Sequence, residues 1–167
     1  MTQDRPRRLA AVWFAGILGY TELSARDEDL ALVVVRKLQR MARKHAQARS
    51  GHVVKLMGDA VLAAFDSVDG ALRAALALRD EFLASLEADA GGISIRVGLH
   101  LGEVADGEDG EVYGDAVNVA SRIEGAAEPG QVVLSQAAFL TVQQRTAIEA
   151  EDLGEFELKG LADPIRL

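Results

Sequence analysis

The chain has 167 residues, of which 49% are hydrophobic and 26% charged, and it carries a net charge of −8 and no cysteine. Such a composition is typical of a single globular domain with one hydrophobic core, and it excludes a disordered chain, a disulfide framework and thiol chemistry. The acidic balance argues against nucleic acid or an anionic membrane as the main partner, and no apolar run is long enough to form a membrane segment.

The first apolar segment, residues 9–15, predicts a buried central strand. Gly16 and Gly19 follow it, so we expect the strand to end in a glycine turn. A helical segment then begins at Tyr20 and Thr21. Backbone N–H groups at such a turn suit a phosphate group, although the same geometry also serves as an ordinary strand-to-helix connection.

The remaining segments alternate between helical and strand patterns. The predicted helices are 28–49, 67–87, 115–125 and a short one at 137–142, and the predicted strands are 52–57, 60–65, 93–105 and 131–134, with one or two closing strands. This order predicts an α+β fold, a ferredoxin-like βαββαβ core with a C-terminal extension. We expect residues 1–167 to be a single domain cut from a longer protein, because the last residues have a strand pattern, and the absence of cysteine favours a cytoplasmic location.

Asp59 lies at the tip of the predicted hairpin between residues 52–57 and 60–65. In a sheet of this topology the tip lies beside the end of the first strand, so we expect Gly16 and Asp59 to be neighbours. Carboxylates at both positions would hold a pair of metal ions, but here one of the two is a glycine. A Gly-Asp pair at a hairpin tip is also ordinary turn chemistry.

Two further sets of polar residues are candidates for chemistry. Asn118 and Arg122 are four residues apart on a predicted helix and therefore share a face. An amide beside a guanidinium suits phosphoryl transfer, although such a pair is also common on protein surfaces. Lys55 lies in an apolar strand, where a lysine is costly unless it reaches a partner or solvent.

Five motifs together resemble the catalytic domain of class III adenylate/guanylate cyclases over nearly the whole chain. They are FAGILGYT (14–21), VKLMGDA (54–60), RVGLHLG (96–102), VYGDAVNVASRIE (112–124) and LKG (158–160). Their order and spacing match the family, which converts a nucleoside triphosphate into a 3′,5′-cyclic nucleotide and pyrophosphate. The resemblance also implies the ferredoxin-like fold that the element order predicts.

The resemblance implies a site at the interface of a head-to-tail dimer, with two divalent ions, Mg²⁺ or Mn²⁺, activating the ribose 3′-hydroxyl. One chain would supply the metal ligands, Asp59 and the backbone carbonyl of Ile17. The amides of Gly19, Tyr20 and Thr21 would hold the triphosphate on the same chain.

The second chain would supply the remaining residues of the site. By resemblance, Lys55 and Glu111 would face the purine, and Asn118 would position the ribose. Arg122 would stabilise the pentavalent phosphate, and Lys159 would contact a phosphate.

Lys55 and Glu111 favour ATP over GTP. Adenine presents an acceptor at N1 and a donor at N6, which match a lysine donor and a carboxylate acceptor, whereas guanine presents the opposite pair. The family's adenine-specific members typically have Asp at the position of Glu111, and Glu keeps the acceptor on a longer side chain.

Gly16 departs from the family pattern, which reads Phe-Ala-Asp where this chain has Phe14-Ala15-Gly16. The missing Asp is normally a ligand of both ions. Three interpretations therefore stay open: an adenylate cyclase impaired by Gly16, an inactive pseudocyclase that binds nucleotide or serves as a regulatory dimerisation module, and the base-reading half of a heterodimer with an intact cyclase chain. RNA binding by the sheet is rejected, because it needs exposed aromatic residues and a basic face.

Overall fold

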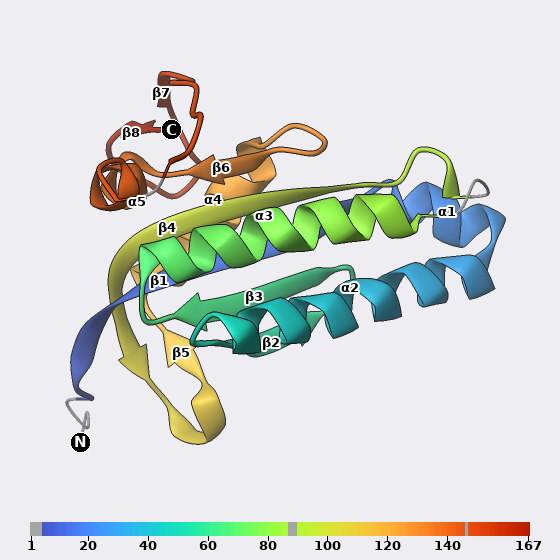
Figure 1. Cartoon of the computed structure of the whole chain (residues 1–167), viewed down its shortest axis with the longest axis horizontal. Helices are drawn as coiled ribbons and strands as arrows, with labels where there is room; N and C mark the ends of the chain where they lie inside the picture. The colour runs from blue at the N-terminus through green and yellow to red at the C-terminus, as the bar shows by residue number, and fades with distance from the viewer. Residues whose placement is uncertain (1–4, 87–89, 146) are drawn as a thin grey trace.

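The computed structural model describes residues 5–86, 90–145 and 147–167, and it has the predicted α+β architecture. Strands β1 (Arg7–Leu18), β2 (Gly51–Met57), β3 (Ala60–Phe65) and β4 (Ser94–Asp106) form an antiparallel sheet in the order β2-β3-β1-β4 (Figure 1). Helix α2 (Glu28–Ala48) connects β1 to β2, and α3 (Val68–Ser85) connects β3 to β4. The predicted βαββαβ core is therefore confirmed.

Short elements extend this core. Strand β5 (Val112–Tyr113) pairs with the end of β4, and β6 (Val132–Leu134) pairs in parallel with its first half. In the chain, helix α4 (Asp115–Ala126) connects β5 to β6, and helix α5 (Gln136–Val142) follows β6. Strands β7 (Glu155–Phe156) and β8 (Ile165–Arg166) form a separate two-stranded sheet. The sequence pattern does not predict β5 or the 3-10 turn Glu108–Gly110 before it, because two or three residues are too few to show a periodicity.

The helical segment that begins at Tyr20 is a separate helix, α1 (Tyr20–Arg26), which the sequence pattern does not resolve. Asp27 ends it in an extended conformation, with φ −152°, and its side chain accepts a hydrogen bond from the Leu30 N–H at 3.1 Å. Asp27 is thus the N-cap of α2, a role in which aspartate is favoured.

The prediction that β1 ends before Gly16 is wrong. Gly16 lies inside β1, opposite Ala60 on one side and Arg96 on the other, and the strand continues to Leu18. A central strand is hydrogen-bonded along both edges, so a single glycine does not end it. The turn is confined to Gly19, whose φ of +82° favours glycine.

The sheet has two covered faces, because successive side chains of a strand point to opposite sides. One face of β1 packs in the core beneath α2 and α3, through Ala11, Trp13 and Ala15. The other face packs with α4, through Ala10, Val12 and Phe14. By the same alternation, a side chain at position 16 would point to the α4 face, where it would have Arg96 as its cross-strand neighbour.

Strand β4 is covered on both faces, not half-buried as its alternating pattern predicts. Ile95, Val97 and Leu99 are fully buried on the α2–α3 face. On the other face α4 lies directly on Gly98, where an added Cβ would be 2.7 Å from the carbonyl oxygen of Ala120. The glycine therefore sets how closely α4 approaches the sheet.

We expect Gly98→Ala to lower the free energy of unfolding by about 2 kcal/mol, since the new methyl group overlaps the α4 backbone and the helix must move away. Urea denaturation measures this loss. Gly125→Ala is the matched control: it lies on the same helix with nothing within 4 Å of an added Cβ, and its stability should be unchanged or slightly higher. Equal stability of the two variants would contradict this account of α4 packing.

The end of the chain, residues 153–167, packs on α4 and β6. Its apolar residues form a third cluster with Val119 and Ile123 of α4 and with Val133 of β6; they are Leu153, Phe156, Leu158, Leu161, Ile165 and Leu167. In the part of the chain that the structure describes, no helix is long and apolar enough to cross a membrane.

Candidate active site

The β2–β3 hairpin tip lies beside the end of β1, as the topology predicts. The Ile17 N–H donates a hydrogen bond to the Asp59 carbonyl oxygen at 2.9 Å, and Gly16 lies opposite Ala60. The Asp59 carboxylate forms no hydrogen bond or ion pair with any of the described residues, so it is available to a ligand. Gly16 and Asp59 are therefore neighbours along two paired strands.

The space of a residue-16 side chain is filled by Glu124 of α4. A Cβ built on Gly16 would overlap Oε1 of Glu124 and would lie 3.2 Å from its Cδ. Arg96 donates from Nε to the same Oε1 at 2.7 Å, and the side chains of Arg96 and Glu124 are 26% and 17% exposed. An ion pair between α4 and β4 thus occupies the position where the sequence resemblance leads us to expect a metal-binding carboxylate.

The residues at this end do not fit a site for two divalent ions. The Asp59 carboxylate has no ion-pair partner among the described residues. The other carboxylate near Gly16, that of Glu124, is neutralised by its ion pair with Arg96. Within residues 5–86, 90–145 and 147–167, no three His, Cys, Asp or Glu side chains lie close enough to hold a metal ion together. Two ions need several carboxylate oxygens, which this set does not provide.

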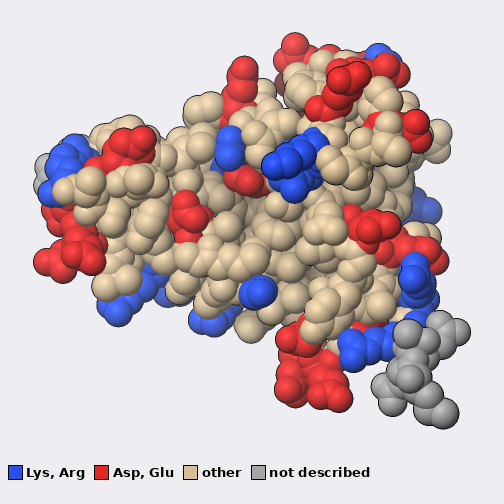
Figure 2. All heavy atoms as spheres, turned by 180° about the vertical axis from the view of Figure 1, so that it is seen from behind, with Lys and Arg blue, Asp and Glu red and all other residues tan. Residues whose placement is uncertain are grey.

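Asn118 and Arg122 lie on the exposed side of α4, one turn apart. Neither makes a side-chain hydrogen bond or ion pair with a described residue. The opposite side of α4 is fixed by Ala116 and Ala120, which are buried against the sheet. Figure 2 views the molecule from the α4 side and shows acidic and basic residues scattered over a largely uncharged surface.

Lys55 also faces the α4 side of the sheet. It is exposed on β2 and lies opposite Leu62 of β3, which packs in the cluster beneath α4. A bulge between Val53 and Lys55 shifts the register at this point. No hydrogen bond or ion pair to Lys55 occurs among the residues that the structure describes.

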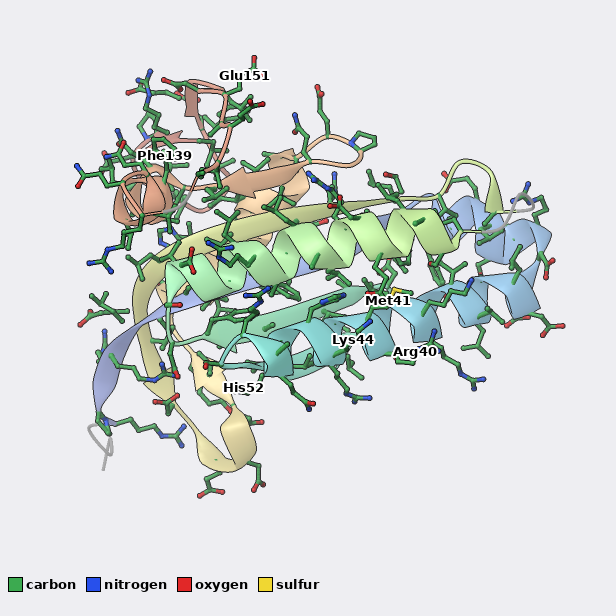
Figure 3. All side chains as sticks on the ribbon, viewed as in Figure 1. Arg40, Met41, Lys44, His52, Phe139 and Glu151 are labelled. Atoms are coloured by element: carbon green, nitrogen blue, oxygen red, sulfur yellow. The ribbon has the colours of Figure 1, made fainter. Side chains whose placement is uncertain are left out.

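Glu111 precedes β5 and is exposed. Its carboxylate accepts a hydrogen bond from the Tyr113 hydroxyl, which raises the pKa of Tyr113 above its ordinary value. Although β2 and β5 lie at opposite ends of the strand order, the His52 ring nitrogen lies 3.0 Å from the Gly110 carbonyl oxygen. His52, labelled in Figure 3, thereby links β2 to the loop that carries Glu111.

The remaining predicted residues lie at the start of α1 and in the turn between β7 and β8. Gly19 precedes α1, whose first residues are Tyr20 and Thr21, and no side chain caps the N-terminus of that helix. Lys159 is exposed in the turn between β7 and β8, next to Leu158, which packs on α4.

The sequence patterns do not identify Arg96 or Glu124 as candidate site residues. Both lie in motifs that carry the family resemblance, but they are far apart in the chain and no local pattern joins them. Strand alternation offers the signal that could have found them, because it places Arg96 on the same face as position 16.

Comparison with known proteins supports the family resemblance of the sequence motifs. A sequence profile of the "Adenylate and Guanylate cyclase catalytic domain" matches residues 3–166. A putative adenylate cyclase 3 from Rhizobium meliloti (strain 1021) is 36% identical over 165 residues, covering 96% of this chain and 28% of that protein. An adenylate cyclase from Streptomyces coelicolor is 36% identical over 141 residues, covering 84% of this chain and 35% of that protein.

The fold agrees as well. The crystal structure of the adenylyl cyclase CyaB from P. aeruginosa superposes with a TM-score of 0.87 and 23% identity, covering 98% of this chain and 93% of that one. The chain spans about a third of the length of the two relatives matched by sequence. Since the profile covers nearly all of it, the chain belongs to the family of adenylate and guanylate cyclase catalytic domains.

Proposed function

We propose that this domain forms 3′,5′-cyclic AMP and pyrophosphate from ATP at the interface of a head-to-tail dimer, and that Gly16 impairs the reaction. The observation that carries the proposal is the orientation of α4. Asn118 and Arg122 are exposed and without partners among the described residues, whereas Glu124 on the same helix faces Gly16 of its own chain.

Helix geometry supports a site shared by two chains. Residues of an α-helix follow one another at about 100° around the axis, so Arg122 lies about 200° from Glu124, on the other side of α4. Asn118 lies about 120° from Glu124 by the same count. Since Glu124 faces its own Gly16, the other two point away from that end and would reach the site of a second chain.

In the proposed reaction the ribose 3′-oxygen attacks the α-phosphorus, pyrophosphate leaves, and the hydroxyl proton is released. Asn118 would hold the ribose, Arg122 would neutralise the charge that grows on the phosphoryl oxygens, and Lys159 would contact a phosphate. On the other chain, the amides of Gly19, Tyr20 and Thr21 would hold the triphosphate.

A divalent ion, Mg²⁺ or Mn²⁺, would lower the pKa of the attacking hydroxyl when bound. We assign Asp59 and the Ile17 carbonyl as the donors that this chain offers. They are too few for two ions, which is why we expect the natural chain to be slow.

Two other functions share this geometry. A chain with an intact α4 and an incomplete Gly16 end suits the base-reading half of a heterodimer with an intact cyclase chain. The same incompleteness suits a pseudocyclase, a regulatory dimerisation module that binds nucleotide without converting it. The ion pair of Arg96 and Glu124 over Gly16 favours the heterodimer half and the pseudocyclase, because a fully active homodimer would need a complete metal site in each chain.

We expect a non-cyclisable ATP analogue to bind at least about tenfold more tightly than its GTP counterpart, because guanine would leave the Lys55 and Glu111 groups mismatched. Calorimetric titration measures both affinities. Lys55→Ala should remove most of the difference. Lys44→Ala is the control, because Lys44 lies on α2 and pairs with Glu81 of α3 on the other face of the sheet.

Equal affinity for both analogues in the natural chain would contradict the assignment of Lys55 and Glu111 to adenine. Absence of binding to either analogue would contradict a nucleotide function altogether. An assay of cyclic AMP and cyclic GMP formation with Mn²⁺ then separates a slow enzyme from a protein that only binds.

A further inference from the structure

We propose that a cavity between α3, β6 and the C-terminal segment (residues 148–167) is a second binding site, which takes an organic amine with an apolar body. The body would enter the cavity, and the ammonium group would lie beside Glu149 and Glu151 at its rim. The cavity has a volume of about 460 Å³, within the range of about 300–1,000 Å³ that is typical of small-molecule sites. Such a site is independent of the proposed cyclase reaction.

The cavity lies away from the candidate active site. It occupies the corner of the molecule where α5, β6 and the C-terminal strands lie next to α3 (Figure 1). Val132 and Leu134 of β6 pack with the core beneath α2 and α3, whereas Val133 between them packs on α4. Among the described residues that line the cavity, none is a candidate residue of the active site. A ligand here would therefore leave the proposed nucleotide site open.

The interior of the cavity is largely apolar. Leu72 and Leu76 of α3 form one wall, and Phe139 and Leu140 of α5 form another. Leu72 is buried, whereas Leu140 is 55% exposed, so apolar surface continues from the interior to the mouth. An apolar ligand that covers this surface removes it from water, which favours binding. The lining thus suits a ligand with a hydrocarbon body.

The two arginines of the lining are already neutralised. Arg79 donates from Nε to Asp80 at 3.0 Å, and Arg166 donates from Nε to Asp152 at 3.0 Å. The Nη1 atom of Arg79 also lies 3.5 Å from the carbonyl oxygen of Gly130. An anionic ligand would have to compete with the two aspartates, so these arginines do not favour one.

The two glutamates of the rim have no such partners. Glu149 and Glu151 are exposed, line the cavity and form no hydrogen bond or ion pair with any described residue. They leave two uncompensated negative charges beside the apolar interior, which attract a cation. The aromatic ring of Phe139, which is labelled with Glu151 in Figure 3, is a further group that attracts cations. The charge and the apolar lining together favour an organic amine.

The experiment is a calorimetric titration of the nucleotide-free natural chain with two probes of the same body and opposite charge, phenylbutylamine and phenylbutyrate. We expect the amine to bind at least about tenfold more tightly than the acid at low salt. Glu149→Gln/Glu151→Gln should remove most of this preference. The matched control is Glu157→Gln/Asp163→Asn, which removes two exposed carboxylates of the same segment outside the cavity lining and should keep the preference.

Leu76→Trp tests the location of the apolar body. The larger side chain would fill part of the cavity, so both probes should bind at least about fivefold more weakly. Circular dichroism checks that the variant is folded, and Leu140→Trp replaces it if it is not. Equal affinity of the natural chain for the two probes would overturn the proposal. So would absence of amine binding, a preference that survives Glu149→Gln/Glu151→Gln, or unchanged binding by the folded tryptophan variant.

Discussion

Gly16→Asp is expected to raise the rate of cyclic AMP formation from Mn²⁺ and ATP by about 100-fold or more. The new carboxylate would point to the α4 face next to the hairpin that carries Asp59, and it would supply the ligand that the natural chain lacks. Even residues that merely support a metal ligand change activity by about 10- to 100-fold, so a direct ligand should have at least this effect. The new Cβ meets the flexible end of Glu124, which can swing away.

Gly16→Ala is the control for this substitution. Its methyl group displaces Glu124 in the same way but brings no charge, so the rate should remain at the level of the natural chain. If Gly16→Asp is as inert as Gly16→Ala, the pseudocyclase interpretation is correct and other parts of the site are also defective. Rapid turnover by the natural chain would show instead that the residue-16 carboxylate is not needed.

The second expected result is complementation between two defective chains. Gly16→Asp/Arg122→Ala should be at least about 100-fold slower than Gly16→Asp, because loss of an arginine that neutralises phosphoryl charge has effects of this size or larger. Mixing that double variant with the natural chain should restore activity. In a head-to-tail heterodimer, the new carboxylate at position 16 of one chain and Arg122 of the other would form one complete site.

Random pairing sets the size of the gain. Half of the dimers in an equal mixture are heterodimers, and one of their two sites is complete, so about a quarter of all sites should work. The control is Gly16→Asp/Arg40→Ala, which should keep its full rate alone; Arg40, labelled in Figure 3, is exposed on α2. A mixture no faster than its components would mean that Arg122 does not act across a dimer interface.

The fold could be predicted because its signals are local. Helical spacing in residues 28–48 and strand alternation around Val97 depend on neighbours in the chain, and the order of these elements allows few topologies. The position of Gly16 within β1 could not be predicted in this way. A glycine usually marks a turn, and only the two flanking strands, at Ala60 and Arg96, hold this one in the sheet.

In the candidate site, too, local motifs could be recognised in the sequence, whereas a contact between distant segments could not. Asp59, Asn118 and Arg122 could be proposed from the sequence because each stands in a short motif whose spacing is tied to its chemistry. The pair formed by Arg96 and Glu124 joins a strand to a helix 28 residues later, and its importance depends on an absent side chain at a third place. Such a relation is visible only when the packing of α4 on β4 is known.

The placement of Glu124 and Arg122 on opposite sides of α4 has a consequence for regulation. The helix packs tightly on Gly98 and is tied to β4 by the ion pair of Glu124 with Arg96. In a head-to-tail dimer one side of each α4 would border its own chain's site and the other side would enter the site opposite. Nucleotide bound at one centre would then alter the second centre through a single helix, and the two would fill cooperatively and not independently.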